Sequence, residues 1–263
     1  YAEQCIVMHH LLLAHGLAVS AIRQNSTEPV QIGIASTGEL CYPSEDTPEN
    51  RAAACRRSFE LTGDNWSFTH NLFMDAACLG HYPESAPAWV TEFAKTIPES
   101  DWEIITQKQD FLGLNVYNGH EVNAEGQYVL RYTGYPRTAL KWPVTPEVMH
   151  YGPLWLYQRY GLPILVTENG QSCNDRIFLD GAVHDPDRID FLHRYLLELR
   201  KAISEGVPLN GYLHWGLTDN FEWDKGYDER FGLVYVDYRN CDRLLKDSAH
   251  WYAEVVRSNG ATL

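Results

Sequence analysis

The chain has 263 residues, of which 44% are hydrophobic and 21% charged, and its formal net charge is -14. This hydrophobic content is typical of a globular protein and argues against a disordered one. The acidic balance argues against a nucleic-acid-binding protein, because neutralising phosphates requires clustered Lys and Arg. We therefore expect no nucleic acid among its partners.

The six cysteines lie far apart, and none forms a Cys-x-x-Cys pair. This spacing indicates neither a zinc ribbon nor a dense disulfide scaffold, so we interpret them as mostly reduced, buried thiols. We expect no segment to approach the eighteen or so apolar residues of a membrane span, and hence a soluble chain without a membrane partner. The chain begins with Tyr1 inside a predicted helix rather than with Met, so its true start and any targeting segment are expected to be missing. Within that limit we expect a cytoplasmic protein.

Strand-like and helix-like segments alternate along the chain, according to the spacing of their apolar residues. In chain order, the first part of the pattern predicts a helix at 2–23, a strand at 31–36, helices within 45–73, a strand at 111–117 and an excursion at 121–132. A helix at 146–160 and a strand at 162–168 follow, and then a long helix that is capped by Asp185, opened by Pro186 and closed by Gly206. The last predicted elements are a strand at 209–215, an extended piece at 232–236 and a helix at 247–256. Neither a repeat nor a low-complexity linker interrupts this alternation, so one domain is expected.

Alternating strands and helices predict a parallel sheet with right-handed crossovers. Four core strands, which start at Gln31, Phe111, Leu162 and Leu209, each end in polar or aromatic residues. In (β/α)8 barrel enzymes the site lies at these strand ends. Four strands cannot close such a barrel, and an open half exposes two unpaired edges. We therefore predict an α/β fold in which residues 1–263 form a single, partial (β/α)8 barrel (TIM barrel) domain that self-associates or requires a complement.

Two segments at strand ends carry candidate chemistry. Glu168 ends an apolar strand and precedes a Gly turn, where a carboxylate can act as a nucleophile. That short segment taken alone is better explained as turn chemistry beside a solvated strand end. After the last core strand come Trp215, Glu222 and Trp223, which together could hydrogen-bond hydroxyls and stack on the apolar faces of sugars. The alternative is a loop whose aromatic residues serve only its own packing, which gives Glu222 no function.

The segment Thr167-Glu168-Asn169-Gly170, the segment 215–223 and the run Arg230-Phe231-Gly232 resemble the C-terminal part of glycoside hydrolase family 1. This family contains the retaining β-glucosidases and β-galactosidases. Residues 111–117 resemble the family's sixth strand. The order and spacing of the later motifs agree through Lys246-Asp247-Ser248. The resemblance implies that the chain corresponds to strands five to eight and begins in the helix that follows strand four.

The resemblance also implies a role for each candidate residue. A retaining glycosidase uses two carboxyl groups roughly 5 to 5.5 Å apart, one as nucleophile and one as acid/base. Glu168 would be the nucleophile, held by a hydrogen bond from Tyr117, with Asn115 beside it. Glu222 and Trp223 would bind sugar hydroxyls, Trp215 would stack against the sugar ring, and Phe231 would form part of the pocket wall. Trp142 would lie on the leaving-group side. For Trp142 alone, a role as an anchor of a surface loop is an equal alternative.

One part of the family's machinery is absent from this sequence. The family's acid/base lies in an Asn-Glu-Pro motif at the end of strand four, and the chain contains no such motif. We therefore expect a retaining β-glycosidase that is inactive without an N-terminal half. Glu222 favours an unphosphorylated sugar, because a carboxylate repels phosphate.

Two other functions were weighed against this one. A non-catalytic sugar-binding or assembly module derived from the same fold would keep the aromatic residues and Glu222 while lacking the acid/base. A metal-dependent barrel hydrolase is disfavoured, because His and Asp do not cluster with ligand spacing at the strand ends. We accordingly expect neither a metal nor a cofactor.

Overall fold

The computed structural model describes residues 1–61 and 66–263. Its centre is a four-stranded sheet in which each neighbouring pair is parallel. The strand order is β1 (Gly33–Thr37), β3 (Phe111–Asn115), β5 (Ile164–Asn169) and β6 (Leu209–His214). The four predicted core strands are confirmed, and β1 and β6 lie at the two ends of the order. Within the described residues the sheet is open.

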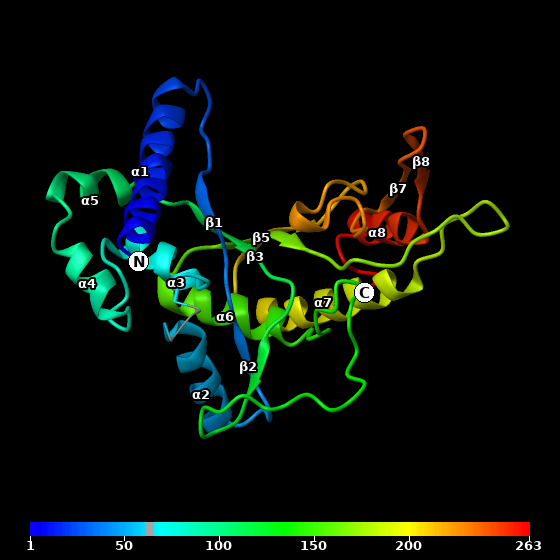
Figure 1. Cartoon of the computed structure of the whole chain (residues 1–263), viewed down its shortest axis with the longest axis horizontal. Coiled ribbons are helices and arrows are strands. Elements are labelled where there is room, and N and C mark those ends of the chain that lie inside the picture. The colour runs from blue at the N-terminus through cyan, green and yellow to red at the C-terminus, as the bar shows by residue number, and fades with distance from the viewer. Residues whose placement is uncertain (62–65) are drawn as a thin grey trace.

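Helices connect the strands, and two small sheets lie outside the central one. The helices are α1 (Ala2–Asn25), α2 (Pro48–Phe59), α3 (His70–Leu79), α4 (Ala88–Ala94), α5 (Glu99–Ile105), α6 (Val148–Tyr160), α7 (Pro186–Ser204) and α8 (Asp247–Arg257). The small sheets are a parallel pair, β2 (Cys41–Pro43) with β4 (His120–Val122), and an antiparallel hairpin, β7 (Val234–Asp237) with β8 (Asp242–Leu245). Figure 1 shows α1, α4 and α5 grouped at one end of the molecule, and α8 with the β7–β8 hairpin at the other.

Local sequence signals explain several helix boundaries. Thr47 caps α2 by accepting a hydrogen bond from Asn50 N, and Pro48 occupies the first turn, where its missing N–H costs nothing. Gly80 and Gly161 end α3 and α6 in the left-handed conformation, with φ of 78° and 67°. Glycine adopts this conformation without a steric penalty, so these helices end where the sequence supplies it.

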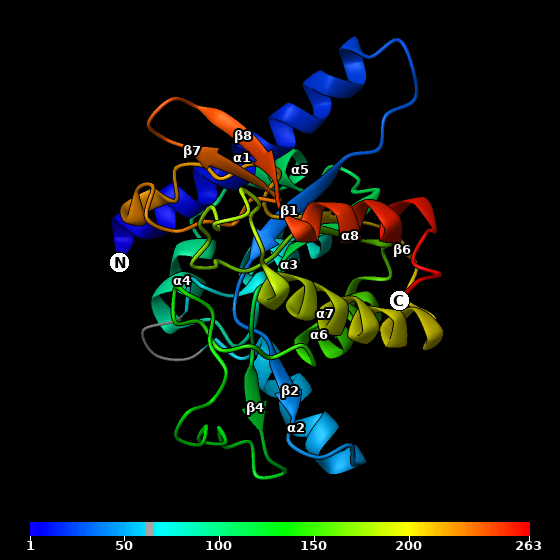
Figure 2. The ribbon, with the colours of Figure 1, turned by 90° about the vertical axis from the view of Figure 1, so that its right-hand side faces the viewer.

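Two buried clusters hold the sheet in place. The larger joins strand residues such as Leu114 and Val166 to Phe191 and Tyr195 of α7. In Figure 2, α6 and α7 run side by side and α8 lies next to α7, which agrees with the contacts between these helices. The smaller cluster lies among α1, α3 and α5, and Ile34 of β1 packs against both clusters. This packing fixes the strands and therefore the residues that follow their carboxyl ends.

Some predicted elements differ from the observed ones. The predicted helical stretch 45–73 contains α2 and the start of α3. Between these helices residues 60–61 and 66–69 are not helical, and residues 62–65 lie outside the described residues. The short helices α4 and α5 were not predicted, because seven residues span less than two turns and give no clear helical period. The pairing of β4 with β2 was also missed, since three residues carry no alternation signal.

Asp185 does not cap α7 as predicted. It stands at the N-cap position, but its side chain makes no cap hydrogen bond. Its carboxylate instead accepts hydrogen bonds from Ser248 N at 2.8 Å and from the Ser248 hydroxyl, and pairs with Arg188. The prediction was wrong because the tertiary structure brings the first turn of α8 and a buried cation to this carboxylate.

The expectation about membrane-length segments was wrong for α1. This 24-residue helix contains an 18-residue window with mean hydropathy 1.8, so by length and composition it could cross a membrane. Polar residues such as His9 and His10 interrupt its apolar runs, but the apolar residues around them keep the mean high. One third of that window is buried inside the structure, and α1 contacts α3, α4 and α5, as a packed core helix also does.

The cysteines are less buried than predicted. All six lie in the described ranges as free thiols, but only Cys5 and Cys41 are buried. Cys241 is exposed, and the other three are half-buried. The interpretation as mostly buried thiols was therefore wrong, because sequence spacing carries no information on the depth of a thiol.

The buried His70 predicts an acid-sensitive fold. It has no exposed surface, and burial lowers its pKa to about 4 despite the opposing effect of the Gly38 backbone. An unfolded histidine protonates near 6.5. Between these values the unfolded chain binds the extra proton, so the free energy of unfolding falls by about 1.4 kcal/mol per pH unit as pH drops. Urea unfolding at pH 7, 6 and 5 measures this slope, and His70→Gln should flatten it. Equal slopes for the two chains would contradict the assignment.

Candidate active site

The ends of β3 and β5 bring a phenol to a carboxylate. Asn115, the last residue of β3, lies opposite Glu168 of β5 in the parallel register. Tyr117 lies two residues beyond β3 and donates its hydroxyl to Glu168 Oε2 at 2.7 Å. Residues at the carboxyl ends of neighbouring parallel strands share one edge of the sheet. The structure therefore places the predicted nucleophile, its predicted partner and Asn115 together.

The Tyr117 hydroxyl stays a proton donor at neutral pH. Burial, followed by the hydrogen bond to Glu168 and that residue's charge, raises the pKa of the Tyr117 phenol. The arrangement thus presents a hydrogen-bonded carboxyl group on a wall of the site, and a carboxylate at such a position can attack an electrophilic carbon.

Neighbouring side chains hold the end of β5 in place. Thr167 donates its hydroxyl to Asn115 Oδ1 at 2.6 Å. Asn169 is fully buried; it donates from Nδ2 to the Val116 carbonyl oxygen at 2.6 Å and accepts from the Tyr212 hydroxyl at 2.7 Å. These contacts on both sides of Glu168 restrict its backbone, so the carboxylate points from a fixed strand end rather than from a free loop.

The segment after β6 brings a second carboxylate to the site. Trp215 directly follows β6, and its Nε1 donates to Glu222 Oε2 at a long 3.4 Å. Burial raises the pKa of Glu222; the Trp215 hydrogen bond opposes the shift, and the negative charge of Glu168 adds to it. Trp223 starts a short 3-10 helix and is 80% exposed. A large exposed indole next to a half-buried carboxylate is a surface suited to a polar ligand with an apolar face.

Three aromatic rings form one wall. The centroid of the Trp142 ring lies 5.2 Å from that of Tyr117 and 6.1 Å from that of Phe231, with the planes tilted or edge-on. The Tyr117 and Phe231 rings are 6.3 Å apart. Phe231 is buried, so it supports the wall from behind. Trp142 is therefore part of the site's wall in the structure rather than an isolated anchor on the surface.

A single cavity of about 790 Å³ gathers all eight residues singled out in the sequence. Its lining includes Asn115, Tyr117, Trp142, Glu168, Trp215, Glu222, Trp223 and Phe231. A cavity of this size lies within the range of small-ligand sites. The residues come from the carboxyl ends of β3 and β5, from the segments after β3 and β6, and from the loop before α6, so only the folded chain assembles them.

The cavity also contains residues that the sequence reading missed. Glu39 and His120 line it, and Glu39 Oε1 accepts a hydrogen bond from the Tyr128 hydroxyl at 2.8 Å and lies 3.3 Å from His120 Nε2. Glu39 follows β1 by two residues, as Tyr117 follows β3. That position was the available signal, since polar residues just after a core strand were what identified the other candidates.

The part of the chain that the structure describes contains no group of three or more His, Cys, Asp or Glu residues arranged to hold a metal ion. The polar groups of the cavity include carboxylates, a phenol, amides, indole N–H groups, the Thr37 hydroxyl, the His120 imidazole and the Lys225 ammonium. Ionised carboxylates and neutral donors can bind hydroxyl groups and can carry nucleophilic and acid–base chemistry.

Comparisons with known proteins show which family the chain resembles over its whole length. The model of glycosyl hydrolase family 1 matches residues 1–261. The chain is 35% identical over 261 residues to a 1,4-beta-D-glucan glucohydrolase of Thermotoga neapolitana, covering 97% of the chain and 57% of that protein. It is 37% identical over 261 residues to beta-glucosidase A of Thermotoga maritima, covering 96% of the chain and 56% of that protein.

The fold comparison gives the same result. A solved structure of the Thermotoga maritima beta-glucosidase in complex with glucoimidazole matches with a TM-score of 0.78 and 38% identity, over 96% of this chain and 56% of that one. The chain thus has an α/β fold that matches β-glucosidase structures of the TIM-barrel family, and it spans about half their length. The resemblance seen in the sequence motifs is confirmed, and the chain belongs to glycosyl hydrolase family 1.

Proposed function

We propose that this chain is the C-terminal part, strands five to eight, of a retaining β-glycosidase of the β-glucosidase type. Its substrates would be terminal, unphosphorylated β-D-glycosides. The observation that carries the proposal is the 2.7 Å hydrogen bond from the Tyr117 hydroxyl to Glu168 Oε2 inside a cavity that also contains Trp215 and Glu222. The names of the relatives, two β-glucosidases and a glucan glucohydrolase, support the substrate class.

In the first step, Glu168 forms a covalent bond with the sugar. Because Tyr117 holds Oε2, we assign the attack on the anomeric carbon to Oε1. The bond from that carbon to the leaving oxygen breaks as the new ester bond forms, and an acid on the other face gives the leaving oxygen a proton. In the second step the same group, now a base, takes a proton from water, whose oxygen attacks the anomeric carbon and releases Glu168.

The other cavity residues bind and orient the sugar in this proposal. Glu222 accepts hydrogen bonds from sugar hydroxyls beside Trp223, and Trp215 provides the stacking floor. Phe231 supports the pocket wall. The contact of Trp142 with the Tyr117 ring supports its assignment to the leaving-group side of the cavity. The carboxylate of Glu222, near that of Glu168, would repel a phosphorylated sugar.

The acid/base is assigned to polypeptide that this chain does not contain. No Asn-Glu-Pro motif is present, and the chain spans about half the length of its relatives. β1 and β6 are end strands of an open sheet, and Leu213 of β6 is 53% exposed. Unpaired strand edges favour pairing with another chain. We infer that an N-terminal half-barrel, or failing that a second copy of this chain, covers these edges, and that the isolated chain is inactive. The relatives give no support to a non-catalytic module.

An activated glycoside tests the nucleophile separately from the missing acid. The leaving group of a dinitrophenyl 2-deoxy-2-fluoro-β-D-glucoside needs no proton, and the fluorine slows release of the sugar. We expect mass spectrometry to find one fluoroglucosyl group on the peptide that contains Glu168, in the chain alone or with an N-terminal half-barrel. Glu222→Ala should retain the label at higher reagent concentration. Labelling that survives Glu168→Ala, or that appears only on another residue, would overturn the assignment.

A further inference from the structure

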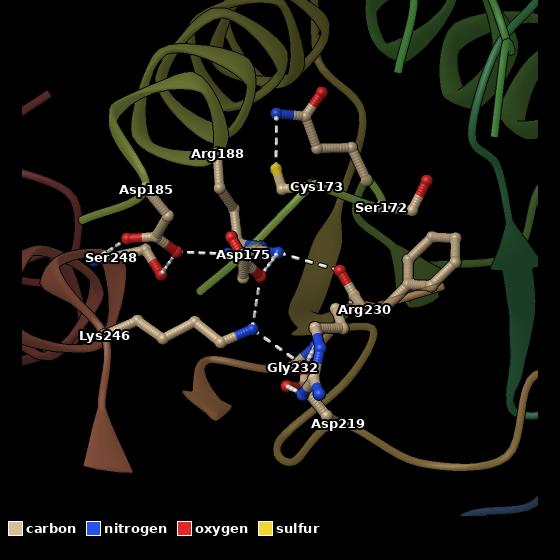
Figure 3. Close-up of polar contacts among 12 residues, drawn as sticks. Ser172, Cys173, Asp175, Asp185, Arg188, Asp219, Arg230, Gly232, Lys246 and Ser248 are labelled. Carbon is tan, nitrogen blue, oxygen red and sulfur yellow. Dashed lines mark hydrogen bonds and ion pairs between the residues drawn. The ribbon is translucent and has the colours of Figure 1, made fainter. Parts of the chain in front are cut away.

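A buried ammonium group links two segments that carry cavity residues, and Figure 3 shows its ion pairs. The Lys246 side chain has no exposed surface, and its Nζ lies 2.6 Å from Asp175 Oδ2 and 2.7 Å from Asp219 Oδ1. Asp175 follows Glu168 by seven residues, and Asp219 precedes Glu222 by three. A single side chain therefore joins the segment after the proposed nucleophile to the segment that carries the proposed sugar ligand.

The carboxylate of Asp219 holds the segment that carries Glu222. This carboxylate pairs with Arg230 at 2.6 Å and with Lys246, and it accepts hydrogen bonds from Gly232 N at 3.0 Å and from Val236 N at 3.4 Å. Position 232 must be glycine for this approach, because a Cβ there would lie 2.1 Å from Asp219 N. The carboxylate thus uses both oxygens to hold its own segment against the chain that leads into β7.

Arg188 completes the network and balances its charge. It is fully buried, pairs with Asp185 and with Asp175 at 2.7 Å, and donates to the Arg230 carbonyl oxygen at 2.8 Å. With Lys246 and Arg230 it supplies three positive charges against the three carboxylates drawn in Figure 3. Buried ion pairs of this kind contribute little net stability, because desolvation offsets their attraction, but they fix geometry.

The segment between Trp215 and Trp223 is held by its backbone and by one buried polar side chain. Gly216 N donates to the Phe231 carbonyl oxygen at 3.3 Å, and Asp219 N donates to the Val234 carbonyl oxygen at 2.9 Å. The apolar side chains of Leu217 and Phe221 are 73% and 59% exposed, whereas Asp219 is 4% exposed. Asp219 is therefore the side chain through which the buried ion network can act on the position of Glu222.

We propose that Asp219 is a positioning residue of the sugar pocket, which, held by Lys246 and Arg230, sets the place of Glu222 relative to Glu168. This inference rests on the proposed function, in which Glu222 accepts hydrogen bonds from sugar hydroxyls. Asp219 itself does not line the cavity, so it acts on a ligand through Glu222 alone. Loss of its charge should weaken sugar binding only when Glu222 is present to be misplaced.

A double-mutant cycle separates positioning from a general structural role. Calorimetry would measure the binding of D-glucono-1,5-lactone to the 263-residue chain, alone and with an N-terminal half-barrel, for the parent, Asp219→Asn, Glu222→Ala and the double variant. We expect Asp219→Asn to weaken binding about tenfold in the parent and less than about twofold in the Glu222→Ala background, as for coupled neighbours. The matched control is Asp237→Asn, the same substitution in an ion pair with exposed Arg239 in the adjacent hairpin, which should change binding in neither background.

The remaining outcomes distinguish the inference from the function on which it rests. If Asp219→Asn does not fold, the variant that combines Asp219→Asn with Lys246→Met takes its place in the cycle. This variant removes one charge of each sign and so leaves no unbalanced buried charge. Equal weakening in both backgrounds would overturn the inference and leave Glu222 as a sugar ligand. If Glu222→Ala bound the lactone as tightly as the parent, the proposed role of Glu222 would fail and the inference with it. A parent chain that bound no lactone in either form would overturn the proposed function itself.

Discussion

Glu168→Ala will abolish the hydrolysis of an aryl β-D-glucoside by this chain reconstituted with an N-terminal half-barrel that carries the family's Asn-Glu-Pro motif. Loss of a covalent nucleophile removes the step on which the pathway depends, so we expect the rate to fall by roughly 10⁴-fold or more, the scale seen for such losses in other hydrolases. Release of the aryl leaving group, followed by absorbance, measures the rate. The fold should survive, because Glu168 lies at a strand end beside a cavity.

Chemical rescue supplies the control for this result. Azide can occupy the space left by the carboxylate and attack the anomeric carbon from the same face, forming an α-glucosyl azide as the aryl group leaves. Azide should therefore restore turnover of an activated aryl glucoside by Glu168→Ala with inverted configuration, and it should not accelerate the parent comparably. Hydrolysis by Glu168→Ala at the parent's rate would remove Glu168 from its role.

Arg188→Met will destabilise the chain by about 3–5 kcal/mol, because it leaves two carboxylates in the interior with less positive charge to balance them. Arg188 is fully buried and pairs with Asp175 and Asp185, neither of which is more than 2% exposed at its side chain. Urea unfolding followed by tryptophan fluorescence measures the change. Methionine occupies a similar volume, so the loss reports the missing charge and hydrogen bonds rather than a cavity.

Arg194→Met is the matched control on the same helix. Arg194 pairs with Asp190 at 2.7 Å, but both side chains are about 60% exposed (59% and 61%). Exposed ion pairs contribute at most about 1 kcal/mol, because water and salt screen them. We therefore expect Arg194→Met to change the free energy of unfolding by less than that amount. Equal effects of the two substitutions would contradict the expectation that removing Arg188 leaves a costly unbalanced charge in the interior.

The sequence predicted the strands of the central sheet because each is a short apolar run with a polar or aromatic end. The same property located most of the candidate site, since residues after parallel strands meet at one edge. Glu39 meets this criterion too. It was missed because the predicted strand ends at Ser36, whereas the observed β1 ends at Thr37, two residues before Glu39. The short helices α4 and α5 and the pairing of β4 with β2 were missed because too few residues carry a period.

Pairings between distant residues could not be read in the same way. Asp185 has the residue type and place of a helix cap, so local rules assign it to α7. Its contacts with Ser248, 63 residues away, exist only because α7 and α8 pack together. Asp219, Arg230 and Lys246 of the ion network likewise stood in recognisable motifs, whereas Asp175 and Arg188 did not. Nothing in those motifs indicated which positive charge pairs with which carboxylate.

By itself the sequence determined the alternation of strands and helices, the family and the identities of eight cavity residues, because these properties reside in short runs of side chains. The tertiary structure decided the rest. Strand register places the Tyr117 hydroxyl on Glu168 across 51 residues, and helix packing brings Lys246 between Asp175 and Asp219. Such contacts depend on distances in space, which the order of residues does not contain until the chain has folded.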